Sequence, residues 1–325
     1  MISKKTISFI LKIGIVFFSI YFLYVQFILK IEDNQVNSFS VFRTINSNIF
    51  SFFLVFFMMF LNWIIEAFKW KLLIKKVEDI SIWTSVRAVF SGITVSTFTP
   101  NRVGEYGGRI FCLSKADRFQ SILITVIGSV GQLTTTVFFG LFGLMFLPNY
   151  LPEILDYNFF RLVSYKLCII CMCFLNLCLV LIFLKTSYLT KLLSHFKFLN
   201  RFKEYIDVFS FYSVKELFYV FLLSNFRYLV FTTQFFILLN TFDNDILYLE
   251  AIPLITIMLL FVSIIPTIVF TELSVRGSVA VFLFGMITSN TIAVFSATFV
   301  MWIINFVFPA LIGTVFVFSL KFFRR

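Results

Sequence analysis

The sequence predicts an all-α polytopic membrane protein with about six transmembrane helices and two re-entrant helical hairpins. Three observations lead to this prediction. Only 13% of the 325 residues are charged and 60% are apolar, whereas soluble domains usually carry about 25% charged residues. Mostly apolar stretches of about 20 residues, the length that crosses a bilayer, follow one another along the chain. Two further apolar stretches are interrupted by proline and by charged residues.

The predicted spans leave no room for a soluble domain, so we expect a single integral membrane domain over residues 1–325. An apolar stretch after Lys4 and Lys5 is long and has no small-residue cleavage site, which favours a retained first helix over a signal peptide. The spans are expected at residues 8–29, 49–69, 119–147, 161–184, 216–240 and 291–320, and the hairpins at 81–115 and 251–289.

The first hairpin contains the stretch TPNRVGEYGGRI, which begins at Thr99. Pro100 stops any helix there, and the apolar arms on either side of it are too short to span. We therefore expect a hairpin whose tip, at Pro100, lies inside the membrane. On the returning arm Glu105 and Arg109 are four residues apart, so they share one helix face and are expected to pair.

The second hairpin repeats this pattern. Pro266 forms its predicted tip, and Glu272 and Arg276 follow on the returning arm, again four residues apart. Irregular backbone at membrane depth persists where protein buries it or where it lines a wet cavity. Two broken segments at matching positions of inverted halves indicate a transport site near the bilayer midplane.

The lysines and arginines of the short loops predict the orientation. Acidic residues without basic ones occupy the loop at 241–250, which is expected outside. The basic segments would lie together on the inner side of a bacterial-type cytoplasmic membrane, with both termini cytoplasmic. Residues 49–147 and 216–320 would then form inverted repeats. The loop after the second span is predicted to hold Lys69, Lys71, Lys75 and Lys76.

Charged residues inside the predicted spans and hairpins are the candidate site. Each would cost about 2.5–3.5 kcal/mol at a lipid-facing helix centre, so they should face inward and pair. Three carboxylates against four arginines leave one positive charge, which suits an anionic head group, because arginine binds phosphate by bidentate hydrogen bonds. The predicted head-group ligands are Arg102, Arg109, Arg227 and Arg276, with Glu66, Glu105 and Glu272 as their charge partners.

Several other functions are disfavoured by composition. The net charge of +11 comes from basic residues in loops, where anionic lipid rather than nucleic acid is the expected counter-charge. The single histidine, His195, lies in a basic loop without a cysteine or carboxylate cluster, so no metal site is expected. We find no Walker, dinucleotide or nucleophile-elbow motif, and therefore expect no cofactor and no enzymatic activity.

The stretches TPNRVGEYGGRIFCL and TELSVRGSVAVFLFG resemble the two most characteristic segments of the lysylphosphatidylglycerol synthase transmembrane-region family, which are flippase-like membrane proteins. The resemblance extends over nearly the whole chain. It implies lipid handling, because the membrane part of the full-length synthases is associated with moving aminoacylated phosphatidylglycerol between leaflets. This chain looks like a stand-alone member without the soluble domain that makes the lipid, so lysyl transfer is not implied.

These observations lead to a membrane lipid translocase as the first hypothesis, with an anionic or aminoacylated phospholipid or a lipid-linked glycan as its cargo. Three alternatives stay open. The first is an integral membrane enzyme in which Glu105 or Glu272 acts as a general acid or base on a lipid-linked substrate. The second is a transporter of a small soluble anion. The third is an assembly partner of a glycosyltransferase or lipid-modifying enzyme.

Overall fold

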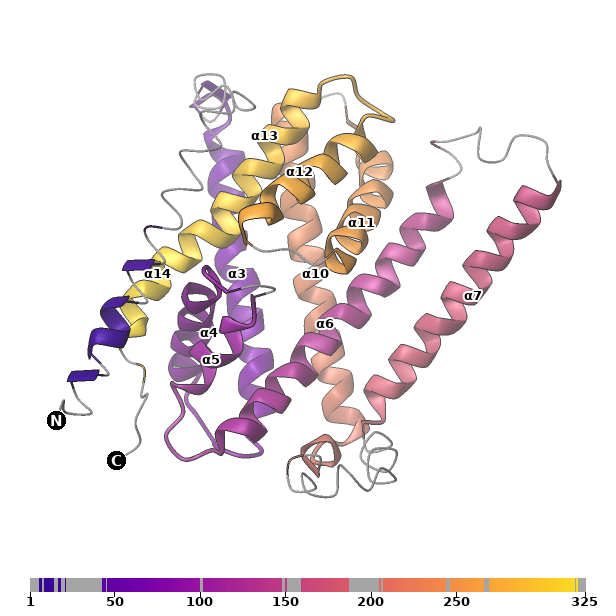
Figure 1. The fold of residues 1–325 in the computed structure, drawn as a ribbon. Coiled ribbons are helices and arrows are strands. Elements are labelled where there is room, and N and C mark those ends of the chain that lie inside the picture. Colours follow the sequence, from indigo (N-terminus) through magenta and orange to yellow (C-terminus); the bar gives the residue numbers. More distant parts are fainter. Residues whose placement is uncertain are drawn as a thin grey trace.

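The structure of this chain is a computed structural model. It describes residues 6–7, 9–14, 17–18, 21, 43–44, 46–99, 102–147, 150, 159–186, 205, 207–243, 246–265, 269–318 and 320. Within these residues every regular element is a helix, which confirms the predicted all-α class. Figure 1 shows long helices that run along the molecule, with shorter helices between them.

Five long helices of the described part are long and apolar enough to cross a membrane. They agree closely with five predicted spans, while the predicted span at 8–29 lies largely outside the described residues. The protein is therefore a multi-pass membrane protein. The helices are α3 (Ile49–Ile74), α6 (Arg118–Phe146), α7 (Phe159–Leu184), α10 (Val214–Phe242) and the continuous segment Thr291–Val317.

Side-chain caps fix where two of these helices begin. The carboxylate of Asp117 accepts hydrogen bonds from the amides of Phe119 and Gln120 at the start of α6. At the start of α10, Ser213 and Glu216 form a capping box, in which each side chain accepts a backbone hydrogen bond from the other residue. Such caps satisfy amides that have no partner within the helix.

The segment Thr291–Val317 is not a uniform α-helix. It comprises α13 (Thr291–Trp302), the π-helical turn η6 (Ile303–Val307) and α14 (Phe308–Val317). Pro309 follows the wide turn directly. Proline has no amide to donate, and its ring would collide with the carbonyl four residues earlier in a regular α-helix, so the wider turn accommodates it.

The two predicted hairpins are present as pairs of short helices. The first consists of α4 (Ile82–Ser96) and α5 (Gly104–Ile110), the second of α11 (Tyr248–Ile264) and α12 (Val269–Phe284). With 7 to 17 residues each, these helices are about 10–26 Å long, less than the roughly 30 Å of a bilayer core. In Figure 1 the helices of the first hairpin lie toward one end of the bundle and those of the second toward the other.

The predicted tip residues themselves, Pro100 and Pro266, lie outside the described residues. The flanking residues show how tightly the first hairpin closes. A Cβ added at Gly108 would lie 2.5 Å from the Cα of Gly92, so α4 and α5 approach each other backbone to backbone. Arg102, just after the tip, has φ of 56°, in the left-handed region that a residue with a side chain adopts at a cost.

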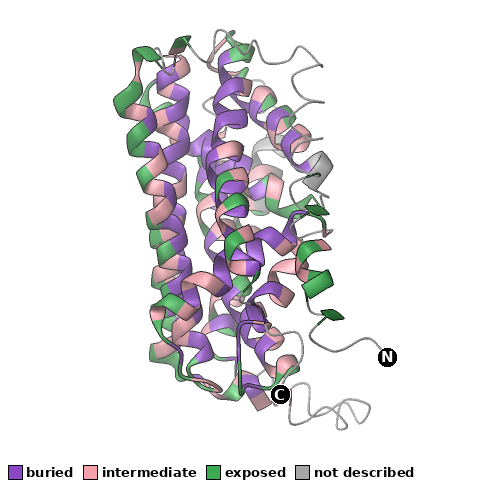
Figure 2. Cartoon of the chain, turned by 90° about the vertical axis from the view of Figure 1, so that its left-hand side faces the viewer, coloured by how far each residue is buried: buried purple, intermediate pink, exposed green. Residues whose placement is uncertain are grey.

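Burial alternates around the long helices, as expected for a bundle in lipid. On α3, Val55 and Met59 are fully buried, whereas Phe53 and Phe57 are 69% and 62% exposed. Figure 2 shows the same division, with buried residues along the inner faces of the helices and exposed ones along the outer faces. Exposed apolar side chains on spans of this length face lipid rather than water.

Candidate functional site

Glu66 on α3 lies at the centre of a buried charged group. Its carboxylate is 2.7 Å from the ammonium of Lys69, 3.0 Å from Arg109 and 2.9 Å from Arg227. Arg109 also bonds Glu105, as the spacing of four residues predicts. Only 4% of Glu66 and 3% of Arg109 is exposed. We call these residues the Glu66 cluster: Glu66, Lys69, Glu105, Arg109 and Arg227.

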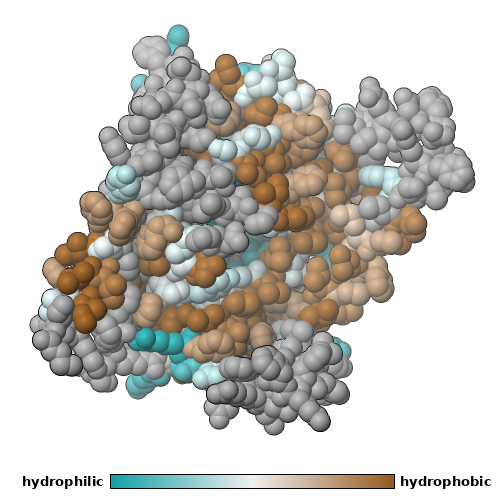
Figure 3. All heavy atoms as spheres, in the orientation of Figure 1, coloured by the Kyte–Doolittle hydropathy of each residue, from teal (hydrophilic) through white to brown (hydrophobic). Residues whose placement is uncertain are grey.

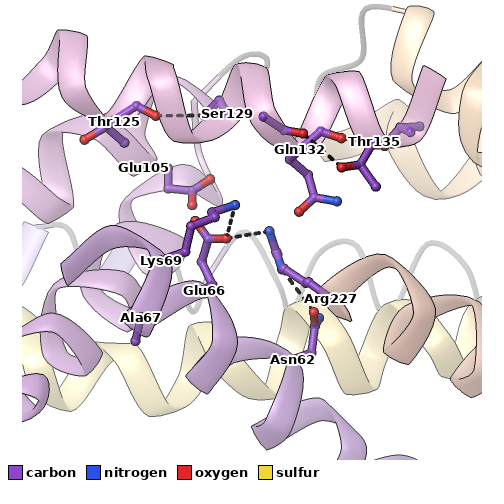
Figure 4. A network of polar contacts seen from close by, with 12 residues as sticks. Asn62, Glu66, Ala67, Lys69, Glu105, Thr125, Ser129, Gln132, Thr135 and Arg227 are labelled. Carbon is purple, nitrogen blue, oxygen red and sulfur yellow. Dashed lines mark hydrogen bonds and ion pairs between the residues drawn. The ribbon is translucent and has the colours of Figure 1, made fainter. Parts of the chain in front are cut away.

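The Glu66 cluster joins elements that are distant in sequence. Figure 4 shows Lys69 and Arg227 converging on the Glu66 carboxylate, with Glu105 close by and α6 running past them. Arg227, on α10, also donates to the Oδ1 of Asn62 at 3.0 Å, and its guanidinium lies 4.9 Å from the centre of the Trp63 ring. These contacts hold the arginine in one orientation from two sides.

Asn62 carries the contact network onward to the last span. Its amide donates to the Oδ1 of Asn305 at 3.5 Å, and Asn305 in turn donates to the carbonyl of Met301. Asn305 lies within the π-helical turn, where one extra residue per turn changes the direction of the side chains. Such turns occur frequently at functional sites.

Glu272 on α12 is the centre of a second charged group. It bonds Arg276 at 3.1 Å, which confirms the predicted pairing of residues four apart. Arg102, from the other hairpin, forms two hydrogen bonds with the same carboxylate, at 2.5 and 3.3 Å, and its guanidinium lies 5.0 Å from the centre of the Phe306 ring. We call Glu272, Arg102 and Arg276 the Glu272 cluster; it ties the returning arms of the two hairpins together.

Both clusters line one cavity of about 570 Å³, bounded by α3, α5, α6, α10, α11, α12 and Arg102. Four of its lining side chains carry a buried polar atom without a hydrogen-bond partner among the described residues: Trp63 Nε1, Gln132 Oε1, Tyr228 OH and Arg276 Nε. A buried polar atom without a partner costs free energy unless water or a ligand satisfies it. The side chains that line the cavity therefore have unused hydrogen-bonding capacity beside its charges.

One side of this cavity has an exposed apolar rim. Leu133 on α6 and Ile264 and Ile265 at the end of α11 line it and are 47%, 64% and 39% exposed. In Figure 3 hydrophilic atoms lie in the middle of a face that is otherwise largely hydrophobic. A cavity with charged walls and an apolar rim can hold a polar group while an attached hydrocarbon chain stays outside.

Two contacts bracket the opening along α6. At one end the hydroxyls of Tyr106 and Ser129 are 3.4 Å apart. At the other, a Cβ added at Gly140 would lie 2.6 Å from Leu260, so α6 and α11 are in close contact there. Between these contacts Ser129, Gln132, Leu133 and Thr136 of α6 line the cavity.

All the charged residues predicted for the site belong to the two clusters. Arg102, Arg227 and Arg276 line the cavity, as do the carboxylates of Glu66, Glu105 and Glu272. Arg109 belongs to the Glu66 cluster but does not line the cavity. It donates hydrogen bonds to the carboxylates of Glu66 and Glu105.

The prediction for Lys69 was wrong. The loop after the second span was expected to hold Lys69, Lys71, Lys75 and Lys76, but α3 extends to Ile74, so Lys69 and Lys71 both lie inside the helix. Lys69 is 1% exposed and pairs with Glu66. The charge count changes with it: the two clusters hold five cations against three carboxylates, a surplus of two positive charges rather than one. The spacing of three residues between Glu66 and Lys69, which places both on one helix face, was the signal that could have revealed the pair.

Fold and site together define a class: a multi-pass helical membrane protein with two broken hairpins around a charged cavity that has an exposed apolar rim. The family described as the lysylphosphatidylglycerol synthase transmembrane region matches residues 9–313, nearly the whole chain. The chain therefore belongs to this family, as its two characteristic stretches predicted, and is a membrane protein that acts on lipids. No curated protein matches the chain.

Proposed function

We propose that the protein is a lipid translocase that moves an anionic or aminoacylated phospholipid, or a lipid-linked glycan, between the two leaflets. The observation that carries the proposal is the cavity, which combines a surplus of cations with an apolar rim that faces lipid. The head group would enter this cavity while the acyl chains remain in the bilayer.

The cationic wall supports the head-group part of the proposal. Arg102 has a side chain that is 36% exposed, so its guanidinium is within reach of a ligand although it is paired with Glu272. Arg276 keeps its Nε without a partner among the described residues. Arginine binds phosphate through two parallel hydrogen bonds, and both of these arginines line the same cavity.

The contact between the hairpins supports a gating step. An anionic head group would compete with the Glu272 carboxylate for Arg102 and Arg276. Once those arginines turn to the ligand, the pair that joins the two hairpins is weakened, and one hairpin can move relative to the other. Ligand binding shifts such an equilibrium only through contacts that differ between the two states, and this ion pair is such a contact.

The proposal requires no bond-breaking step, no cofactor and no ATPase motif. We place the protein in a bacterial-type cytoplasmic membrane with both termini cytoplasmic, as the loop charges predict. A glycosyltransferase or lipid-modifying enzyme is the proposed source or recipient of the cargo.

The proposal is tested by following lipid redistribution in proteoliposomes. Fluorescent phosphatidylglycerol and lysylphosphatidylglycerol are placed in one leaflet, and their appearance in the other is measured by chemical quenching. Wild type is compared with the double variant Glu105→Gln, Glu272→Gln. The matched control is Glu250→Gln, the same change at an exposed carboxylate that does not line the cavity.

We expect wild type and the control to move lipid at equal rates, and the double variant to lose at least about 90% of the rate, since charge contacts of this kind contribute about 1.5–3 kcal/mol each. Size-exclusion profiles and helix content verify that the variant is folded. Redistribution at protein-free rates in wild type, or an unchanged rate in the folded double variant, would refute the proposal. Chemical conversion of the lipid, detected by mass spectrometry, would indicate an enzyme instead.

A further inference from the structure

The charges around the cavity specify more than an anion. The Glu66 cluster contains three cations and two carboxylates, so it holds one surplus positive charge. The Glu272 cluster contains two arginines and one carboxylate, so it also holds one. The surplus is thus divided between two groups on the wall of the same cavity.

Each cluster also has free hydrogen-bonding capacity beside its surplus charge. In the Glu272 cluster this is the Nε of Arg276. Next to the Glu66 cluster it is the Nε1 of Trp63, whose ring lies against Arg227, and the hydroxyl of Tyr228. Trp63 and Tyr228 are each only 4% exposed, so these donors are unpartnered atoms on a buried wall. A ligand that neutralises the surplus charge of both clusters needs negatively charged oxygens on both sides.

We propose, building on lipid translocation, that the cargo carries two negative charges on phosphate. A phosphate monoester at the end of a lipid has about this charge near neutral pH, whereas the phosphodiester of phosphatidylglycerol has about one negative charge. Near neutral pH a phosphate monoester carries about −1.5 to −2, because its second pKa is about 6. In a site enclosed by apolar helices, the better-bound ligand is the one that neutralises both surplus charges.

Lys69 is the residue that sets this preference. Without its ammonium, the Glu66 cluster would be neutral and the cavity would hold a single surplus charge, matching a phosphodiester. Lys69 lines the cavity, is 1% exposed and is 2.7 Å from the Glu66 carboxylate, so its charge acts inside the site rather than at the surface. It is a specificity-determining residue by this argument.

The test compares two lipids that differ in head-group charge but share their acyl chains. Dioleoyl phosphatidic acid carries the monoester and dioleoyl phosphatidylglycerol the diester. Displacement of fluorescent phosphatidic acid from the purified protein at pH 8 gives relative affinities, and proteoliposomes give relative rates. Inorganic phosphate is the third competitor, because at pH 8 it carries about two negative charges without a hydrocarbon chain.

We expect phosphatidic acid to bind about 10- to 100-fold tighter than phosphatidylglycerol, the range that one further charge-assisted contact provides. Lys69→Met should reduce this ratio to within about threefold of unity while phosphatidylglycerol binding changes little. The control Lys75→Met, the same change at an exposed lysine outside the cavity, should keep the wild-type ratio. Arg276→Met removes a surplus charge from the other cluster and should also lower the ratio, so the test stands even if Lys69→Met does not fold.

The outcomes separate this inference from the proposed function. Equal or weaker binding of phosphatidic acid in wild type, or an unchanged ratio in folded Lys69→Met and Arg276→Met, overturns the two-charge inference even if lipids are translocated. A strong preference for phosphatidic acid without redistribution of any lipid supports the charge inference and refutes translocation. Displacement by inorganic phosphate as effective as that by the lipid identifies a soluble anion as the ligand and overturns the lipid cargo.

Discussion

Replacing Glu66 by glutamine perturbs the site most severely, because one carboxylate compensates three cations. The contacts with Lys69, Arg109 and Arg227 measure 2.7, 3.0 and 2.9 Å, and the side chain of Glu66 is 6% exposed. Removing one partner of a buried ion pair typically costs about 3–5 kcal/mol, since the remaining charge stays buried without compensation. Glutamine keeps the volume and the hydrogen-bonding capacity of the side chain, so the change in the free energy of unfolding measures the effect of removing the charge.

The expected result for Glu66→Gln is therefore a loss of about 3–5 kcal/mol in the free energy of unfolding, measured by denaturant titration of the purified protein in nanodiscs. Adding Lys69→Met should restore about 1–2 kcal/mol, because it removes one of the uncompensated cations. Glu250→Gln, at an exposed site, should change stability by less than about 0.5 kcal/mol. A loss below about 1 kcal/mol for Glu66→Gln, or further destabilisation by Lys69→Met, would contradict the reasoning.

Two further predictions concern packing. A Cβ at Gly108 would lie 2.5 Å from the Cα of Gly92, so Gly108→Ala should force α4 and α5 apart. We expect this change to lower the free energy of unfolding by about 1–3 kcal/mol and to slow translocation. Gly107→Ala is the control, because its Cβ would meet nothing closer than 3.8 Å. Equal stability of the two variants would disagree with the close approach. Trp70 donates to the hydroxyl of Thr125 at 3.1 Å, so Trp70→Phe should cost about 1–2 kcal/mol in chemical unfolding and leave the lipid preference unchanged; an altered preference would connect this contact to the cavity.

The spans and hairpins were predictable because they depend on local properties of the sequence. Hydropathy over about 20 residues identifies a membrane helix, and the predicted and observed bounds of α6 and α10 differ by a few residues at most. The pairs Glu105–Arg109 and Glu272–Arg276 follow from helix geometry alone.

The contacts between elements were not predictable in this way. Arg102 and Glu272 are 170 residues apart and Arg227 and Glu66 are 161 apart, so their pairing depends on how the helices pack. Lys69 illustrates the same limit, because its place near the end of an apolar run is equally compatible with a loop. Only the rotation of α3 against α6 and α10 places its ammonium inside the cavity.

The π-helical turn at Ile303–Val307 also has no simple sequence signal. Pro309 indicates a distortion in the preceding turn, but a kink, a bulge and a helix end are all compatible with a proline at this position. The choice is made by packing: a Cβ added at Gly313 would lie 2.1 Å from the carbonyl oxygen of Phe90, so α14 is in close contact with α4 beyond the turn. The position of Asn305 in the network follows from that choice.

The proposed translocation depends most directly on the contact between the two hairpins, and a charge swap tests this contact. Lipid redistribution is measured for Arg102→Glu, for Glu272→Arg and for the variant with both changes. We expect each single change to abolish redistribution, because like charges then face each other where Arg102 meets Glu272, and we expect the double variant to recover a substantial part of the wild-type rate. Wild-type rates in the single variants, or a folded double variant no faster than either of them, would contradict it.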